Sequence, residues 1–502
     1  MFYKLASNPT YMPSQLMVRL FTAIASLLLS VYAFATDDLI NSDGVLYIDM
    51  ARAFLEGGLS QSAELYDWPF FSILVAAIHL LTGIPLERSG ELLNIVLFVV
   101  FTDALLLIGQ KLLPNTRHLL IAGLFILGFT LFVDYRAYLF RDLGYWAFIS
   151  LSLYFFITFQ EAPKLSKAIY WQLSILFAIL FRVEGVAFAA LMPLLLLAKQ
   201  EPVVNRVKNL AMLWAPFLII AISAITFALS TSEISSSFAK LGEVLRYINF
   251  SDNLENFYER ADVINLHVLS QFAKDDGALV LFSGLLVMMA VDVITALSIG
   301  YLILYLISRH QTKPLQINPI TKNTLEIFIL INILILAVFC LTKFFLSTRY
   351  AFMLVTALFL LMLPRLCQYV DQALINKSKF GLALTFLVLI SGPIDGLTSS
   401  VSKSYIKESA LWAAQNLPEN TSTLAFDTIS DYYLRENQAK TDVHLAVRTP
   451  KIKDRNYDYL IVVVKKKDTD LQSQLKQINS RVIFSSENNR GDKSLVLQTM
   501  SD

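Results

Sequence analysis

Apolar runs long enough to cross a lipid bilayer recur along most of the sequence. A spanning helix needs about 20 consecutive, mostly apolar residues. Hydrophobic residues make up 56% of the 502-residue chain and charged residues only 16%, against roughly 25% charged residues in an ordinary soluble protein. We therefore expect an α-helical polytopic membrane protein. Eleven spanning helices are predicted, near residues 16–35, 89–110, 119–133, 144–160, 168–181, 186–198, 210–229, 288–308, 325–342, 350–364 and 380–397.

The distribution of Lys and Arg predicts the orientation of these helices, because cytoplasmic loops are enriched in both residues. With the N-terminus in the cytoplasm, the inside segments carry roughly twice the density of Lys and Arg of the outside segments. We then expect an integral protein of a bacterial inner membrane, with its C-terminal region in the periplasm. A cleaved signal peptide is the alternative for residues 16–35, because Ala33 and Ala35 fit a signal-peptidase site. The net charge of +1 gives no indication of a nucleic-acid partner.

Two outer loops, 36–88 and 230–276, are too long to be simple connections. The first contains SDGVLYIDMARAFLEGG, which has helical spacing and ends at two glycines, and then DWPFFSILVAAIHLLTG. Counting the second segment as a span would place the Lys- and Arg-rich loops outside, so both segments are predicted to be helices at the membrane interface. The apolar stretch 277–308 is too long for one span, and its first part is a candidate for a further interfacial helix before the span 288–308.

The composition changes after residue 397, which divides the chain into a membrane domain, 1–397, and an extracytoplasmic domain, 398–502. In the second domain SYIKESALWAAQNL, DYYLREN and TDLQSQLKQI have helical patterns, whereas TSTLAFD, DYLIVVVK, RVIFSS and KSLVLQ are typical of strands. The continuous Ile and Val run indicates a sheet that is covered on both faces. We expect a small α/β domain that caps the membrane domain, binds the acceptor or docks a partner, with a purely structural role as the alternative.

Asp43 is the leading candidate for chemistry in the first outer loop. It lies one helical turn before Tyr47, so the two side chains share one face of the predicted helix. A carboxylate near the hydrocarbon boundary is partly desolvated and can act as a general base. The alternative is that acids in this loop only keep it hydrated, and we favour that interpretation for Asp37, Asp38, Glu56 and Glu64.

Four motifs follow one another on the predicted outer face: DGVLYIDMARAFLEGG, FRDLGYW, LFRVEGVAF and FLSTRYAFMLVTALFLLMLP. In this order they resemble the GT-C class of multi-spanning glycosyltransferases, in particular the group of aminoarabinose–lipid A transferases and protein O-mannosyltransferases, over residues 16–365. The resemblance implies a GT-C-like fold and transfer of a sugar from a polyprenyl-phosphate donor to a lipid, glycan or protein acceptor at the outer face. It implies that Asp43 is the catalytic base. The substrate-binding residues that it implies are Tyr47, Asp142, Arg182, Glu184, Arg349 and Tyr350.

One segment departs from that family. Many relatives carry a basic residue before a proline at the start of the second interfacial helix, where it meets the lipid phosphate, whereas this chain has Asp67-Trp68-Pro69. Phosphate binding is then expected to depend on Arg141, Arg182 and Arg349. Each of two arginines also has a structural alternative: Arg182 could form an ion pair with Glu184 between helices, and Arg349 could be an anchor that reaches the interface.

Two other functions are compatible with parts of the sequence. A membrane transporter or lipid flippase would use ionisable residues inside spans, such as Asp103 and Asp292, although we expect both to have packing partners inside the bundle. A surface-polysaccharide polymerase or ligase would rely on arginines and a histidine in a late outer loop, where His267 lies. His79 and His267 are isolated from other ligand types, so no metal site is predicted, and whether a divalent cation serves as a cofactor is left open.

Overall fold

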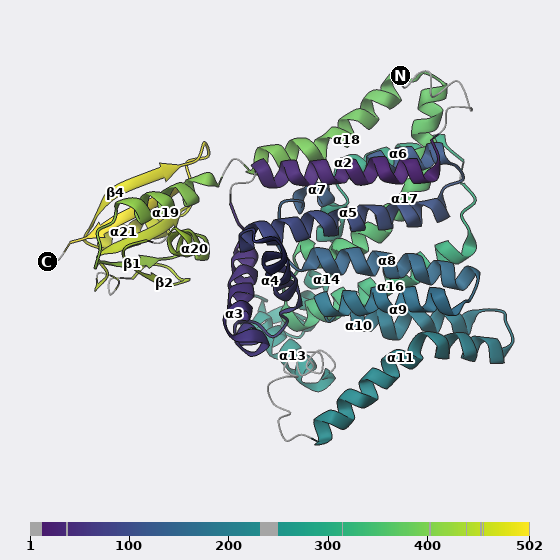
Figure 1. Cartoon of the computed structure of the whole chain (residues 1–502), viewed down its shortest axis with the longest axis horizontal. Coiled ribbons are helices and arrows are strands. Elements are labelled where there is room, and N and C mark those ends of the chain that lie inside the picture. Colours follow the sequence, from purple (N-terminus) through teal and green to yellow (C-terminus); the bar gives the residue numbers. More distant parts are fainter. Residues whose placement is uncertain are drawn as a thin grey trace.

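The computed structural model describes residues 13–500 of the chain, except 37–38, 231–248, 314, 401–402, 438, 452–453 and 455. Most of the described residues are helical, and the long helices lie beside one another in one bundle (Figure 1). The helices of the bundle are α2 (Gln15–Thr36), α5 (Leu86–Leu112), α6 (Thr116–Gly128), α7 (Thr130–Asp134), α8 (Asp142–Glu161), α9 (Leu165–Phe181), α10 (Gly185–Leu191), the 3-10 helix η2 (Met192–Ala198), α11 (Val203–Ser230), α15 (Ile299–Gln311), α16 (Pro319–Lys343), α17 (Thr348–Ile375) and α18 (Lys379–Ser400).

Six of the described helices are long and apolar enough to cross a membrane: α2, α5, α8, α14 (Gly277–Ala296), α16 and α17. Several shorter apolar helices, among them α6 and α9, complete the bundle. The helices α5, α8 and α17 are mostly buried by their neighbours, whereas α2 is mostly exposed. The expectation of a polytopic α-helical membrane protein is confirmed.

The predicted span 119–133 is divided at Phe129 into α6 and α7. At this point the backbone of α18 passes close to that of α6. A Cβ added to Gly128 would lie only 2.7 Å from the carbonyl oxygen of Leu389. Glycine permits this approach since it has no side chain. The hydrophobic pattern alone does not reveal such a crossing, which explains why one continuous span was predicted.

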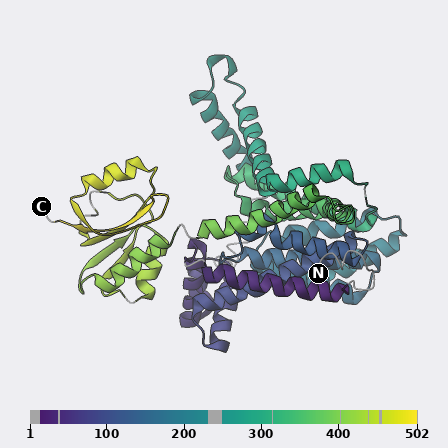
Figure 2. The ribbon, with the colours of Figure 1, turned by 90° about the horizontal axis from the view of Figure 1, so that it is seen from above.

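The predicted span 288–308 is wrong as a single helix. The chain leaves α14 at Ala296 and begins α15 at Ile299, and Ser298 between them has a φ of 60°. Figure 2 shows in teal a helical hairpin that projects sideways from the bundle, in which α13 (Phe250–His267) packs against α14. The first part of 277–308 is therefore a separate helix, but it extends further along the chain than predicted. The span 186–198 also changes, from α-helix to 3-10 helix, at Met192.

The first outer loop forms two helices, α3 (Ser42–Leu65) and α4 (Phe70–Thr82), which stand across one end of the bundle (Figure 1). This placement agrees with the prediction that neither is a span. The glycine pair does not end α3 but bends it, because Gly58 has a φ of 74° inside the helix. Leu80 and Leu81 at the end of α4 are largely exposed, as expected for a helix that faces lipid headgroups and acyl chains.

The C-terminal region forms a five-stranded mixed sheet in the order β2-β1-β3-β5-β4. β1 pairs in parallel with β2 and β3, whereas β5 is antiparallel to β3 and β4. Along β3, Ile461 lies in a core that includes residues of α19, while Leu460 and Val462 pack with Leu471 of α21, so both faces are covered as expected. The elements are α19 (Ser404–Asn416), β1 (Ser422–Ala425), α20 (Thr428–Glu436), β2 (Asp442–Leu445), β3 (Tyr459–Val464), α21 (Thr469–Gln477), β4 (Ser480–Glu487) and β5 (Lys493–Thr499).

Two details of this domain differ from the sequence analysis or refine it. The short strand β2 was not predicted, because its mostly exposed residues lack an apolar pattern. The predicted domain boundary after residue 397 falls in the last turn of α18. The domain lies at the same end of the bundle as α3 and α4 (Figure 1), and its helix α20 contacts α3.

Asp103, an acid inside a predicted span, has a partner in the bundle. Its two carboxylate oxygens accept hydrogen bonds of 2.7 and 2.6 Å from Nε and Nη2 of Arg19 on α2, which confirms the expected packing role and weakens the case for a transporter. Asp292 lies half-buried on α14.

We expect the Asp103→Leu variant to be less stable than the Arg19→Met/Asp103→Leu double variant. The single change leaves the arginine without its counterion, whereas the double change replaces the whole pair by apolar groups, and losing one partner of a buried pair costs about 3–5 kcal/mol. The pair here is only part-buried, so its cost should be smaller. Thermal denaturation in detergent measures both variants, and equal stability of the two would contradict the pairing.

Candidate active site

Five charged side chains that the sequence analysis singled out meet at the end of the bundle where α3 lies. Asp43 comes from the first turn of α3, Asp142 from the start of α8 and Arg349 from the start of α17. Arg182 and Glu184 lie between α9 and α10. Their charges alternate along one chain of contacts, from Asp43 through Arg349, Asp142 and Arg182 to Glu184.

The contacts in this ionic chain are direct. Nη1 of Arg349 donates to Oδ2 of Asp43, and its Nε lies 3.9 Å from Oδ1 of Asp142. Arg182 donates from Nη1 to the same Oδ1 of Asp142, and from Nη2 and Nε to the two carboxylate oxygens of Glu184, the Nε bond being 3.2 Å long. The ion pair between Arg182 and Glu184, the structural alternative for Arg182, is therefore present. It is one of several contacts in the ionic chain.

The ionic chain is buried at its centre and more exposed at its two ends. Asp142 is 1% exposed and Arg182 is 7% exposed, whereas the Asp43 side chain is 38% exposed. Charges this deeply buried are tolerated when they are paired and hydrogen-bonded. Asp43 is thus the most exposed carboxylate of the ionic chain, followed by Glu184, whose side chain is 31% exposed. Asp142 pairs with both arginines at the buried centre.

The local sequence explains how Asp43 reaches this position. Gly44 follows it, and a Cβ on Gly44 would lie 2.9 Å from Cγ1 of Ile40 and 3.2 Å from Cβ of Leu139. The absent side chain lets α3 approach the segment that leads into Asp142. In addition, Oδ1 of Asn41 accepts a 2.8 Å hydrogen bond from the backbone N–H of Leu139, which ties the two segments together.

Arg141, directly before α8, is paired with a phenol and not with a carboxylate. Its Nη2 donates a 2.9 Å hydrogen bond to the neutral hydroxyl of Tyr66, and its guanidinium lies 4.9 Å from the centre of that ring. Its Nε is buried without a hydrogen-bond partner, and no carboxylate of the described residues pairs with it. Burial opposes the charge, but the nearby Tyr47, Tyr66 and Glu184 favour it more, so the pKa of Arg141 is raised.

Three further side chains complete the surroundings. Tyr350 lies beside both arginines of the ionic chain, with its ring centre 5.4 Å from the Arg182 guanidinium and 5.5 Å from that of Arg349. Tyr47 is buried against Phe71, and burial raises its pKa, so the phenol stays protonated at neutral pH. Burial works against ionisation of Glu184, but the guanidinium of Arg182 outweighs it and lowers the pKa of Glu184 to about 2.

The structure therefore brings together all eight residues predicted for the site. Sequence reasoning missed Tyr66 and Asn41, which position Arg141 and the start of α3, because neither belongs to a motif. In the segment Asp67-Trp68-Pro69, Asp67 is exposed and the indole N–H of Trp68 is buried without a partner. Among the described residues, no group of three or more His, Cys, Asp and Glu side chains could hold a metal ion, and His267 lies exposed at the end of α13.

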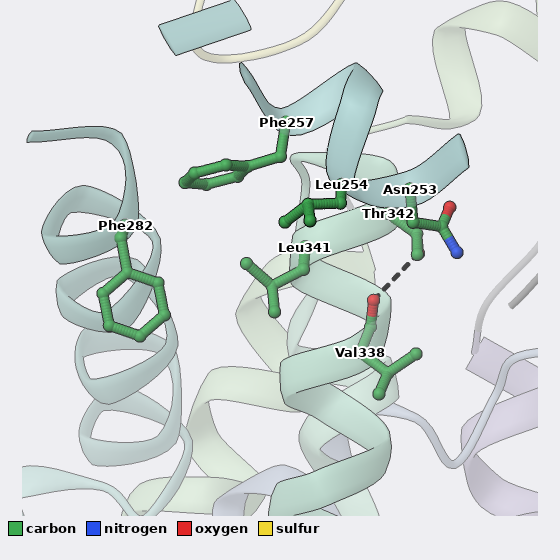
Figure 3. A pocket seen from close by; sticks show the side chains of 7 residues that line it. All are labelled: Asn253, Leu254, Phe257, Phe282, Val338, Leu341 and Thr342. Atoms are coloured by element: carbon green, nitrogen blue, oxygen red, sulfur yellow. Dashed lines mark hydrogen bonds between the residues drawn. The ribbon is translucent and has the colours of Figure 1, made fainter. Parts of the chain in front are cut away.

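A hollow of 220 Å³ lies between α13, α14 and α16 (Figure 3). Its walls are mostly apolar, with Leu254 and Phe257 facing Phe282 and Leu341. None of its lining residues belongs to the ionic chain, but Phe339, next to Val338 in α16, lies against Tyr350, with 4.3 Å between the ring centres.

Two solved structures match this chain. ArnT from Cupriavidus metallidurans, solved in the apo state, matches with a TM-score of 0.52 and 12% sequence identity over 95% of this chain and 97% of ArnT. The arabinofuranosyltransferase AftD from Mycobacteria matches with a TM-score of 0.47 and 11% identity over 98% of this chain and 42% of AftD. No family model and no curated protein matches the chain. The likeness to ArnT confirms the expected GT-C-like fold.

Proposed function

We propose that this chain is a glycosyltransferase that moves a sugar from a polyprenyl-phosphate carrier to a hydroxyl group of a lipid, glycan or protein. The observation that carries the proposal is the ionic chain, in which a solvent-accessible carboxylate, Asp43, is paired with Arg349 of α17 and is linked through Asp142 to Arg182. The GT-C-like fold supports it, because such a site lies where the ends of several spanning helices meet interfacial helices. The excess of Lys and Arg in the opposite loops supports an extracytoplasmic position for the site.

The donor's chemistry fits this arrangement. The hydrocarbon tail of a polyprenyl-phosphate sugar lies in the bilayer and its phosphate lies at the interface. When the bond between the anomeric carbon and the phosphate oxygen breaks, its electron pair stays on the phosphate, and the anomeric carbon passes through an oxocarbenium-like state. The acceptor hydroxyl forms the new bond, and its proton passes to Asp43. Positive groups that stabilise the growing charge on the phosphate lower the barrier.

Donor binding and activation of the base are linked in this proposal. In the structure Arg349 is paired with Asp43, and Arg182 is paired with Asp142 and Glu184. A phosphate that takes the guanidinium of Arg349 releases Asp43, and a carboxylate released from a cation is a better proton acceptor. Arg141, which donates to a neutral phenol and has a free Nε–H, is the arginine best placed to hold the phosphate without giving up an acid.

We expect Arg141→Gln to raise the KM for the donor by roughly 10–100-fold, because charge-assisted hydrogen bonds contribute about 1.5–3 kcal/mol each. The kcat should change less. Arg88→Gln is the matched control, since Arg88 is an exposed arginine of α5 paired with Glu91. Steady-state kinetics with a reconstituted protein measures both, and an unchanged donor KM in Arg141→Gln would remove this arginine from the phosphate site.

The direct test is turnover by the purified protein in lipid. It is incubated with a panel of synthetic polyprenyl-phosphate pentoses, hexoses and aminosugars together with extracted envelope lipids, glycans and proteins. The expected result is acceptor-dependent release of free polyprenyl phosphate, measured by mass spectrometry. Absence of release from every donor, by a protein that remains folded, would overturn the proposal.

A further inference from the structure

The C-terminal domain contacts the helix that carries Asp43. The hydroxyl of Tyr433, on α20, accepts a 3.1 Å hydrogen bond from the backbone N–H of Ile40. Ile40 lies three residues before Asp43, in the segment that leads into α3. The contact is buried, and it joins residues that are 393 positions apart in the chain.

A second set of contacts holds the same helix further along. The guanidinium of Arg435 donates to both carboxylate oxygens of Asp49, at 3.2 and 3.0 Å, and its Nε donates to Asp431 of its own helix at 2.9 Å. Arg52 of α3 donates in the opposite direction, to Glu436 of α20. These ion pairs are partly exposed, so each contributes little alone, but together they fix where α20 lies along α3.

The start of α3 is thereby held from two sides. On one side Asn41 accepts a hydrogen bond from the backbone N–H of Leu139. Leu139 lies three residues before Asp142, which pairs with two arginines. On the other side Tyr433 holds Ile40. The position of Asp43 relative to Arg349 therefore depends on a side chain from the extracytoplasmic domain as well as on the bundle.

We propose that Tyr433 is a positioning residue for catalysis: through the Ile40 N–H it fixes the start of α3, and with it the carboxylate of Asp43. This inference rests on the proposed function. Catalysis demands more precise placement than folding does, because a misplaced group loses the pre-organisation that lowers the barrier. The C-terminal domain then contributes to the reaction without touching either substrate.

The neighbouring tyrosine of α20 provides a matched control. Tyr432 donates a 2.9 Å hydrogen bond to Glu87 at the start of α5, so it makes the same kind of interdomain contact with a helix that carries none of the residues of the ionic chain. Tyr433→Phe and Tyr432→Phe each remove one hydroxyl and leave the ring. We expect Tyr433→Phe to lower kcat roughly 3–10-fold with an unchanged donor KM, as for the loss of one hydrogen bond, and Tyr432→Phe to leave kcat within about twofold of wild type.

Backbone hydrogen exchange of the full-length protein tests the same contact without any substrate. Amides of residues 39–45 should exchange faster in Tyr433→Phe than in wild type and Tyr432→Phe, while the rest of α3 changes less. Equal kcat losses in the two variants, or unchanged exchange at the start of α3, would overturn the inference. A wild-type protein that turns over no donor would instead refute the proposed function, and in that case the exchange result still decides whether Tyr433 positions Asp43.

Discussion

Replacing Asp43 by asparagine should lower kcat by roughly 10²–10⁴-fold, the usual contribution of a positioned general base. Asparagine has the same shape as aspartate but is not a base at neutral pH, so the acceptor hydroxyl would have no group to take its proton. The donor KM should not rise and should fall if it changes, since the phosphate no longer competes with the Asp43 carboxylate for Arg349. Steady-state kinetics with the reconstituted protein measures both constants.

The loss must be separated from the loss of the Asp43–Arg349 ion pair. Arg349→Gln breaks the same pair from the other side. It should raise the donor KM, because it removes the guanidinium that is assigned to the phosphate. Glu56→Gln, an exposed acid on the same helix, should leave both constants unchanged. If Asp43→Asn and Arg349→Gln gave the same increase in KM and the same kcat, Asp43 would be a structural partner of the arginine, and the proposed base would be lost.

The sequence predicted the identity of the site residues better than their partnerships. Asp43, Arg182 and Arg349 each belong to a recognisable motif next to an apolar run, and these runs are the strongest signal in the chain. That Asp142 lies between two arginines depends on how α8, α9 and α17 pack, and neither composition nor spacing contains this information. The neutral partner of Arg141, Tyr66, was missed for the same reason.

The fold shows a similar division. The helices α3 and α4 were predicted, because counting the apolar α4 segment as a span would place the Lys- and Arg-rich loops outside, and α4 has only 13 residues. The breaks at Phe129 and Ser298 were not, because they arise where another helix crosses or where the chain leaves the bundle, in apolar stretches that look continuous. The docking of α20 on α3 brings together residues that are far apart in the sequence. The sequence alone contains no signal for such a contact.

The buried centre of the site makes a second strong prediction. Arg182→Gln should destabilise the protein by about 3–5 kcal/mol, the usual cost of removing one partner of a buried ion pair. Arg182 donates to both Asp142 and Glu184, and Asp142 is 1% exposed, so the variant would leave a buried carboxylate without its closest cation. The midpoint of thermal denaturation in detergent should fall by several degrees, with donor turnover lost as well. Arg88→Gln, whose side chain is 63% exposed, should leave the midpoint unchanged.

The Arg182→Gln/Asp142→Asn double variant distinguishes charge from shape. If the instability comes from a buried unpaired carboxylate, neutralising Asp142 should recover part of the lost stability, because two neutral amides can hydrogen-bond where a lone charge cannot be solvated. If Arg182 is needed only to fill space, the second change should make the protein no more stable, and often less so. A double variant that melts at or below the temperature of Arg182→Gln would therefore contradict the view that the alternating charges hold this end of the bundle together.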